Sequence, residues 1–443
     1  LNKAAIDGLA LTRRVAYERE GGRMRARAWL VIVVALSLVG IAACSPRRSS
    51  ATIEVDKPVA LADAPVHARV SGLGSGDEVT ISAQAHDAGG KVWRSQAQFT
   101  ADGGGVVDLD RAQPKSGTYQ GVDGMGLLWS MNPPDGDPDQ AIYSDPDQAT
   151  YFPAEGSSFT VDLTVAVGDR QLATRSFTRQ WLGDGVTVRT LRTDRDQVAG
   201  VLALPPAGSP ARVAVLAIGG SGGGVGMAAD AALLASHGHP TLALAYFRYP
   251  GRPDQLRDIP LEYFATAARR LATESGVRRG RVAALGYSRG TEPAMLVGAY
   301  FPELINGVVA YAPTSRAEAG FPNGGTAWTR AGKPVAAGSP IPVERLDGPI
   351  LLLAGGDDKL WPAARFVQEV TDRLDAHRFG HPHQALVYPQ AGHGVGTFPF
   401  QPAGTTLIHP VTGGLIALGG TRPANAAARR DGWPKVLEFL DQL

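Results

Sequence analysis

The sequence predicts an antiparallel β-sandwich followed by an α/β domain whose mostly parallel sheet has helices on both faces. Between about residues 57 and 195, short segments alternate apolar and polar residues with a period of two, and no helical stretch separates them. After residue 198, apolar runs of strand length alternate with helical stretches. Within that second region, residues 286–290, Gly-Tyr-Ser-Arg-Gly, lie between an apolar run and a helical stretch.

A chain of 443 residues is too long for one ordinary domain. We expect an N-terminal extension with a signal peptide over residues 1–44, a linker over 45–56, the sandwich over 57–195 and the α/β domain over 198–443. Apolar residues make up 44% of the chain and charged residues 19%, which is typical of a globular protein. The formal net charge of +1 and the lack of a long Lys/Arg run argue against a nucleic-acid partner.

The N-terminal region resembles the signal peptide of a bacterial lipoprotein. Met24 opens a short basic stretch, an apolar run extends from Trp29 to Ala43, and small residues lead into Cys44. The run is too short to span a bilayer comfortably but has the length of a signal-peptide core. We therefore expect Cys44, the single cysteine, to carry lipid and to anchor the protein to the bacterial cell envelope, facing the periplasm or the exterior. If the run is not a signal, the protein is expected in the cytoplasm.

The sandwich strands are predicted from their alternation. Residues 66–70, 78–84 and 159–165 have a period of two, which places the apolar side chains of each segment on one face. Clusters rich in Asp and Gly at 87–90 and 102–105 predict turns between such strands. Two sheets that each bury one face against the other satisfy this pattern.

The α/β region is predicted from the order of its elements. We expect strands at residues 213–218, 241–246, 282–286, 307–312, 349–354 and 384–388. We expect helices near residues 227–237, 261–274, 292–300 and 363–377, and over part of 424–443. Helical connections between the strands indicate a parallel sheet that is covered on both faces.

The segment from Gly286 to Gly290 fits a nucleophile elbow, a sharp turn between a strand and a helix. Its glycines allow the turn and the close approach of neighbouring backbone, so that the hydroxyl of Ser288 stands above the sheet. A Gly-x-Ser-x-Gly motif alone is weak, and here the strand before it and the helix after it support it. Ser288 is therefore the candidate nucleophile of an α/β-hydrolase fold.

A serine hydroxyl is a poor nucleophile until a base removes its proton. His393 lies in a loop just after the strand expected at 384–388, which is where this fold places its histidine. His409 also comes late in the chain, but no strand-to-loop context precedes it, so its claim is weaker. We therefore assign the base to His393.

The base needs a carboxylate that holds its tautomer. The strand expected at 349–354 leads into two adjacent acids, Asp357 and Asp358. Asp358 has the Gly-x-x-Asp spacing that is usual after this strand, and Asp357 stays open as the alternative. The chain order Ser, Asp, His is that of α/β hydrolases.

The oxyanion hole should consist of two backbone N–H groups. Arg289, directly after the nucleophile, supplies one of them. The other is expected in the glycine run after the strand at 213–218, at Gly220 or Ser221. This run lacks the Lys-Ser/Thr of a phosphate-binding loop and the spacing of a dinucleotide fingerprint, so we expect no cofactor. We also expect no metal site, because the histidine spacings lack a third ligand.

Several longer phrases in the chain are distinctive. In the first half, the phrase is Gly-Thr-Tyr-Gln-Gly-Val-Asp-Gly-Met-Gly-Leu-Leu-Trp-Ser at residues 117–130. In the second half, the phrases are Leu-Ala-Tyr-Phe at 244–247, Leu-Glu-Tyr-Phe at 261–264, Ile-Pro-Val-Glu-Arg at 341–345, Gly-Asp-Asp-Lys-Leu-Trp at 356–361 and Tyr-Pro-Gln-Ala-Gly-His at 388–393. With these phrases, the chain resembles the acyl-CoA thioesterase and bile acid-CoA:amino acid N-acyltransferase family over nearly all of residues 55–443.

The resemblance implies an immunoglobulin-like β-sandwich before an α/β-hydrolase domain. It also implies thioester chemistry through Ser288, Asp358 and His393. In this family, transfer of the acyl group to an amine is associated with cysteine at the nucleophile position, whereas serine favours hydrolysis. One feature departs from the family: a lipoprotein signal would place the protein outside the cytoplasm, where coenzyme A is not expected.

We therefore expect a serine hydrolase that cleaves a small-molecule acyl thioester of the acyl-CoA type through an acyl-enzyme on Ser288. An exported carboxylesterase acting on other esters and an N-acyltransferase to an amino acid are the alternatives. A non-catalytic surface-binding lipoprotein is a further alternative, and the intact set of Ser288, Asp358 and His393 argues against it.

Overall fold

The computed structural model describes residues 51–87, 90–133, 137–140 and 157–443. The expected signal peptide and Cys44 lie outside these residues. The described residues form one compact unit. Within the described residues, no helix combines the length and the apolar character needed to cross a membrane.

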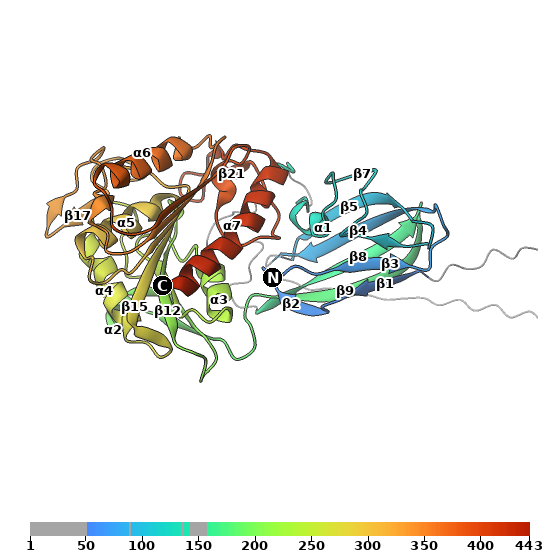
Figure 1. Cartoon of the computed structure of the whole chain (residues 1–443), viewed down its shortest axis with the longest axis horizontal. Coiled ribbons are helices and arrows are strands. Elements are labelled where there is room, and N and C mark those ends of the chain that lie inside the picture. Colours follow the sequence, from blue (N-terminus) through green and yellow to red (C-terminus); the bar gives the residue numbers. More distant parts are fainter. Residues whose placement is uncertain (1–50, 88–89, 134–136, 141–156) are drawn as a thin grey trace, which may run out of the picture. The chain divides into compact units, whose positions relative to one another are not determined.

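The first part of the described chain forms two sheets, as the alternating segments predict (Figure 1). The larger sheet has the strand order β2-β9-β8-β4-β5-β7, and the smaller one the order β1-β3-β6. The strands are β1 (Thr52–Val55), β2 (Val59–Leu61), β3 (Ala68–Ser71), β4 (Glu78–His86), β5 (Val92–Thr100), β6 (Val107–Asp108), β7 (Ser116–Gly117), β8 (Ser158–Val167) and β9 (Arg170–Gln180). Along β4, every second residue from Val79 to Ala85 is buried, and buried residues of both sheets share one hydrophobic cluster. The expected sandwich is confirmed.

Strand β1 corrects the expected linker. Residues 52–55 fall within the range 45–56 predicted as a linker, yet they pair with β3 in antiparallel register. The side chains of Ile53 and Val55 are buried, whereas Thr52 and Glu54 are exposed. A strand of four residues gives only two periods of alternation, which the polar residues before it obscure in the sequence.

The second part of the chain, within residues 187–443, contains an eight-stranded sheet of order β10-β11-β13-β12-β15-β16-β19-β20. Its strands are β10 (Thr187–Leu191), β11 (Ala199–Leu204), β12 (Arg212–Ile218), β13 (Thr241–Ala245), β15 (Val277–Tyr287), β16 (Val308–Tyr311), β19 (Ile350–Gly355) and β20 (His383–Tyr388). From β13 to β20 all neighbouring strands are parallel, as the alternation of strands and helices predicts. This is the sheet of an α/β hydrolase.

Strand β10 shifts the expected boundary at residue 195. Residues 187–191 lie inside the predicted sandwich range, but they pair with β11, which pairs with β13. By sheet membership, the change therefore falls between β9 and β10. The sequence missed this because β10 and β11 form an antiparallel edge, and the helix between them, α2 (Thr193–Asp196), is too short to show a helical pattern. The division of the chain into separate domains stays a prediction.

The two faces of the parallel sheet are both covered, and the strand sequences explain why. In β12, the side chains of Val213, Val215 and Ala217 belong to one hydrophobic cluster, and those of Ala214, Leu216 and Ile218 belong to the other. Such strands are apolar along their whole length because neither face meets water.

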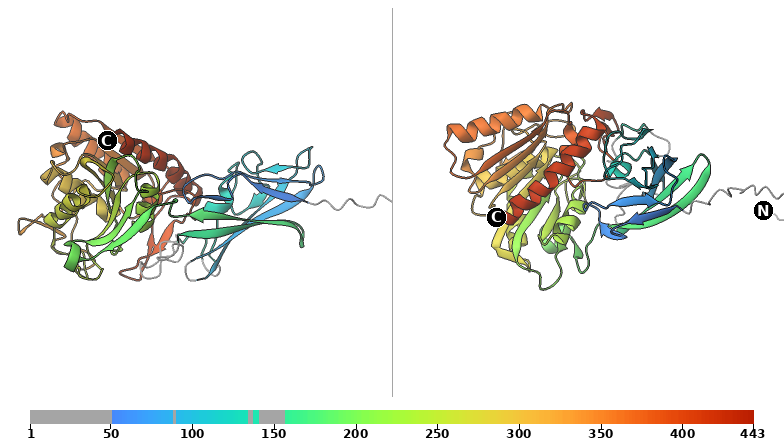
Figure 2. Two further views of the ribbon diagram at one scale, coloured as in Figure 1. Left: turned by 90° about the horizontal axis from the view of Figure 1, so that it is seen from below. Right: turned by 45° about the vertical axis from the view of Figure 1, so that its right-hand side comes forward.

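Five helices supply the covering layers, and each lies where the sequence predicts it (Figure 2). Buried residues of one face pack with α4 (Leu261–Ala272), α5 (Thr291–Tyr300) and α6 (Ala363–Ala376). Those of the other face pack with α3 (Ala228–Ser236) and α7 (Arg422–Gln442). The loops that carry the expected site residues follow the carboxyl ends of the central strands, at the edge of the sheet where ligands bind in such folds.

Candidate active site

Strand β15, in the middle of the sheet, ends at Tyr287 and leads through a 3₁₀ turn, Ser288–Gly290, into α5. Ser288 has φ of 54°, in the left-handed region that non-glycine residues rarely adopt. Its side chain is buried among the loops above the sheet, with 4% of the residue exposed. The turn is therefore the sharp, strained elbow that the motif predicts.

The two glycines of the motif have no room for a side chain. A Cβ at Gly290 would lie 2.1 Å from the carbonyl oxygen of Ile218, at the end of β12. A Cβ at Gly286 would lie 2.5 Å from the carbonyl oxygen of Gly290. The elbow thus packs backbone against backbone, which fixes Ser288 relative to the loop that follows β12.

Ser288, His393 and Asp358 form one hydrogen-bonded chain. His393 Nε2 lies 2.8 Å from Ser288 Oγ, and His393 Nδ1 lies 2.8 Å from Asp358 Oδ2. An ionised carboxylate only accepts hydrogen bonds, so Nδ1–H donates to Asp358 and Nε2 is left to accept the hydroxyl proton of Ser288. This is the tautomer that a general base for Ser288 requires.

The histidine is held by its surroundings. Its backbone N–H donates to the carbonyl oxygen of Leu418, and its carbonyl oxygen accepts the hydroxyl of Tyr287. The ring packs against those of Tyr287 and Trp361, with centroid distances of 5.6 Å and 5.5 Å. These contacts limit rotation of the imidazole and keep both ring nitrogens aligned with their partners.

The structure separates the two adjacent acids. Asp358 Oδ1 accepts the backbone N–H groups of Leu360 and Trp361, which turns Oδ2 toward His393. The carboxylate of Asp357 instead pairs with Lys359 and accepts the N–H of Gly420. Asp358 is the acid in contact with the histidine.

The glycine run after β12 lies beside the elbow. A Cβ at Gly220 would be 3.2 Å from Cβ of Ser288 and 3.6 Å from its Oγ. The hydroxyl of Tyr246 lies 2.9 Å from the carbonyl oxygen of Gly219 and 3.1 Å from that of Gly220. Because a trans peptide directs its N–H opposite to its C=O, the N–H of Ser221 points away from Tyr246. Gly220 and Ser221 are thus brought to the nucleophile, as is Arg289 by its place in the chain; their part in an oxyanion hole stays a prediction.

A pocket of about 70 Å³ opens at Ser288, the candidate nucleophile. The candidate residues Gly220, Ser221, Ser288 and His393 line it together with apolar side chains and with Tyr287, His409 and Arg429. The apolar lining consists of Leu360, Leu407, Pro410, Ile416 and Leu418. The apolar side of the pocket can therefore receive an uncharged group attached to a reacting carbonyl.

His409 lines the pocket, although its place in the sequence supported only a weak claim to a catalytic role. It follows β21 (Thr406–Ile408), which pairs with β22 (Leu415–Ala417) in an antiparallel hairpin. The signal was present in the sequence as two short apolar segments around the turn-like residues Pro-Val-Thr-Gly-Gly, 410–414. Strands of three residues are too short to be recognised by alternation alone.

A buried ion pair anchors the elbow from behind. Arg289 Nε donates to Glu292 Oε1 over 2.5 Å, and Glu292 is fully buried. Glu292 Oε2 also accepts the indole N–H of Trp328 and the backbone N–H of Glu318. Burial raises the pKa of Glu292, and the Arg289 guanidinium opposes this rise. The side chain of Arg289 is therefore engaged below the elbow, so that the predicted contribution of Arg289 to an oxyanion hole can come only from its backbone N–H.

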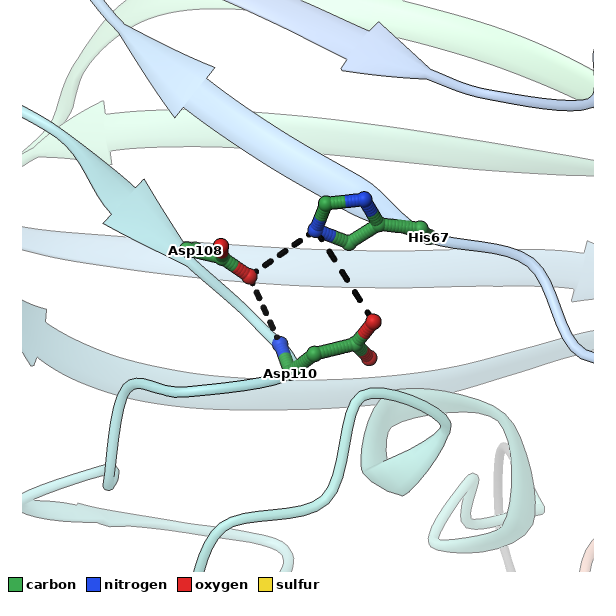
Figure 3. Close-up of side chains that lie close together, drawn as sticks. All are labelled: His67, Asp108 and Asp110. Carbon is green, nitrogen blue, oxygen red and sulfur yellow. Dashed lines mark hydrogen bonds and ion pairs between the residues drawn. The ribbon is translucent and has the colours of Figure 1, made fainter.

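A second group of ionisable side chains lies on the sandwich (Figure 3). His67 Nε2 is 2.9 Å from Asp108 Oδ1 and 3.8 Å from Asp110 Oδ2. The hydrogen bond with Asp108 raises the pKa of His67 above 6.5. Asp108 Oδ1 also accepts the backbone N–H of Asp110. A half-exposed ion pair explains these contacts, and we assign no metal to them.

Comparison with known proteins places these features in a family. The family model "Acyl-CoA thioester hydrolase/BAAT N-terminal region" matches residues 63–193, and "BAAT / Acyl-CoA thioester hydrolase C terminal" matches residues 325–443. Human acyl-coenzyme A thioesterase 6 is 30% identical over 407 residues, which cover 85% of this chain and 93% of the human protein. The chain belongs to the acyl-CoA thioester hydrolase/BAAT family. It is accordingly an enzyme of the thioester and ester hydrolase type.

The family contains more than one activity. Mouse acyl-coenzyme A amino acid N-acyltransferase 1 is 29% identical over 402 residues, which cover 86% of this chain and 95% of the mouse protein. Among solved structures, MGS-M1, an α/β-hydrolase enzyme from a deep-sea metagenome library, covers 59% of this chain and 100% of its own, with 14% identity and a TM-score of 0.38.

The backbone packing of the elbow predicts the effect of Gly290→Ala. The added Cβ meets the carbonyl oxygens of Ile218 and Gly219 at 2.1 and 2.5 Å, so the elbow must move away from β12. We expect a loss of stability of at least about 1–3 kcal/mol, the usual cost of overpacking, together with loss of activity. Urea denaturation and enzyme assays measure both. Gly380→Ala is a control for the substitution itself, because a Cβ there meets nothing within 4 Å and its φ, like that of Gly290, is not positive. Unchanged stability of Gly290→Ala would contradict the packing argument.

The ion pair of His67 with Asp108 predicts how the stability of the fold changes with pH. Because its pKa is raised in the folded state, the pair stabilises the fold below pH 6.5 and loses its effect as the pH rises through the raised value. Asp108→Asn should lower the pKa of His67, measured by NMR of its ring protons. Asp110→Asn should lower it less, since Asp110 lies 3.8 Å away. An unchanged His67 pKa in Asp108→Asn would refute the assignment.

Proposed function

We propose that this enzyme hydrolyses acyl thioesters of the acyl-CoA type through an acyl-enzyme on Ser288. The observation that carries the proposal is the continuous hydrogen-bonded chain from Ser288 through His393 to Asp358, at the edge of the sheet where this fold carries out its chemistry. The names of the relatives, acyl-CoA thioesterases for the most part, supply the substrate class.

Acylation begins when Ser288 Oγ attacks the thioester carbonyl carbon. His393 Nε2 takes the hydroxyl proton, and Asp358 stabilises the resulting imidazolium through Nδ1–H. The carbonyl oxygen becomes an oxyanion, which the backbone N–H of Arg289 and that of Gly220 or Ser221 stabilise. The C–S bond then breaks, and His393 returns the proton to the leaving thiolate.

Deacylation repeats these steps with water as the nucleophile. His393 removes a proton from water, the hydroxide attacks the serine ester, and Ser288 leaves with the proton from the imidazolium. The product is a carboxylic acid. A serine ester reacts less readily with amines than a cysteine thioester does, so the oxygen nucleophile favours hydrolysis over N-acyl transfer.

The apolar part of the pocket suits the acyl group next to the carbonyl. Leu407, Ile416 and Leu418 belong to or border the β21–β22 hairpin, and Leu360 follows Asp358. Such a lining gains free energy from burying methylene groups and offers little to a charged one. We therefore place the acyl chain on this side of the pocket.

We also propose that Cys44 carries lipid and holds the enzyme at the cell envelope. The basic stretch, the apolar run of residues 29–43 and the small residues before Cys44 support this. An enzyme in that compartment would meet esters more readily than coenzyme A thioesters. A carboxylesterase acting on other esters is therefore the second candidate function.

Ser288→Ala should lower turnover by a factor on the order of 10³ or more, because it removes the nucleophile. Asp358→Asn should lower it by about 10²- to 10⁴-fold, because the amide no longer supports the catalytic tautomer. Asp357→Asn is the matched control and should retain wild-type rates, since Asp357 contacts Lys359 and Gly420 rather than His393. Purified proteins would be assayed on a series of acyl-CoA thioesters and p-nitrophenyl esters.

The same assay contains the results that would contradict the proposal. Equal rates for wild type and Ser288→Ala on every substrate would refute the role of Ser288. Hydrolysis of simple esters with none of acyl-CoA would refute the thioesterase proposal and favour the carboxylesterase.

The lipid anchor has a separate test. In cells that express the full chain and are fed a radioactive fatty acid, this protein should incorporate the label. The labelled protein should be recovered in the membrane fraction. Cys44→Ser should abolish the label and leave the activity of the purified enzyme unchanged. Label that persists in Cys44→Ser, or is absent from the wild type, would exclude the anchor at this position.

A further inference from the structure

His409 lies where the β21–β22 hairpin meets the glycine run after β12. The turn of the hairpin packs on that run, because a Cβ at Gly222 would be 3.2 Å from Cγ of Pro410. His409 itself is buried, with 5% exposed, and its ring centroid lies 4.9 Å from that of Phe321. The imidazole therefore packs against Phe321 at the wall of the pocket.

The hydrogen bonds of His409 define its tautomer. The backbone N–H of Val411 donates to Nδ1 over 3.2 Å, so Nδ1 carries no proton. Burial lowers the pKa of His409, and the nearby charge of Arg248 lowers it further, which keeps the ring neutral. A neutral ring with an unprotonated Nδ1 has its proton on Nε2. His409 Nε2 thus donates to Ser221 Oγ, 2.9 Å away.

This donation determines what the hydroxyl of Ser221 can do. Its oxygen already accepts from His409, so its own proton must go to another acceptor. Among the described residues, His409 is the hydrogen-bond partner found for Ser221 Oγ. Ser221 also lines the same pocket as Ser288, and Gly220 before it lies against the nucleophile. The remaining hydroxyl proton is available to a substrate in the pocket.

We infer that the Ser221 hydroxyl, oriented by His409, donates a hydrogen bond to the substrate carbonyl oxygen as that oxygen becomes an oxyanion. Ser221 is then a catalytic residue through its side chain, in addition to the backbone donors, and His409 is a positioning residue that acts through it. No covalent bond is made or broken by either residue. The inference rests on the proposed attack by Ser288.

A purely structural role would give a different result. The His409–Ser221 hydrogen bond also connects the hairpin to the glycine run. If this were its only role, the bond would act on folding and on the shape of the pocket. Its loss would lower the amount of folded enzyme or raise KM. An oxyanion donor acts in the transition state, so its loss lowers kcat and leaves KM nearly unchanged.

The test uses Ser221→Ala, His409→Phe and the double variant of the full enzyme, assayed on the best substrate of the series. Rates are expressed per active site, counted by labelling Ser288 to completion with a fluorophosphonate, so that unfolded protein does not enter the comparison. Ser221→Ala should lower kcat by about 10- to 100-fold. The upper value is the smallest loss usually seen when one donor of an oxyanion hole is removed. KM should change by less than about twofold.

His409→Phe keeps the ring volume but removes the donor, and it should lower kcat in the same way. The double variant should be no slower than Ser221→Ala, because His409 acts through Ser221. Two conservative variants should restore most of the rate: Ser221→Thr keeps the hydroxyl, and His409→Gln keeps an N–H donor. Ser339→Ala and His383→Phe are controls outside the pocket and should behave like the wild type.

Three results would overturn the inference: a kcat of Ser221→Ala within twofold of the wild type, a loss expressed in KM alone, or losses that multiply in the double variant. Ser288→Ala keeps the two proposals apart. If Ser288→Ala is inactive while Ser221→Ala is fully active, only the role of Ser221 fails. If Ser288→Ala is as active as the wild type, the proposed function itself fails.

Discussion

The close contact between the backbones of the elbow and of β12 is the constraint on which the rest of the site depends. Gly290 lies directly on the carbonyl oxygens of Ile218 and Gly219, and this contact sets the nucleophile beside the glycine run. Ser288 can hold its left-handed conformation, which costs on the order of 1–3 kcal/mol, only where its surroundings leave no alternative. The hydroxyl of Thr291, which donates to the carbonyl oxygen of Ser288, helps to hold it there.

The buried pair of Arg289 and Glu292 extends this constraint below the turn. Its charges are withdrawn from water, and they are compensated by each other, by Trp328 and by backbone groups near Glu318. The network therefore joins the elbow to the segment between β16 and β19. A site built in this way holds Ser288, His393 and the glycine run in place before substrate arrives, which is the condition for the proposed stabilisation of an oxyanion.

Most of the eight-stranded sheet and of the candidate site could be predicted from the sequence. The reason why a residue could or could not be identified differs from residue to residue. Ser288 and His393 were identifiable because each follows a long apolar strand and sits in a local motif. Asp357 and Asp358 could not be separated, since the choice depends on the N–H groups of Leu360 and Trp361. His409 was undervalued because its importance comes from Ser221, which lies 188 residues earlier in the chain. Strands β1 and β10 were missed because short or edge strands carry little pattern of their own.

The separation of the three candidate residues along the chain has a consequence for folding. His393 lies 105 residues after Ser288 and 35 after Asp358, and each of the three is carried by a different strand of the parallel sheet. Contacts between residues so distant in sequence form slowly, after the loops between them have closed. A nascent or partly folded chain therefore holds a serine without its base. In the proposed mechanism, Ser288 gains its base only when the last parallel strand, β20, has joined the sheet, so that the hydrolase cannot act before its fold is complete.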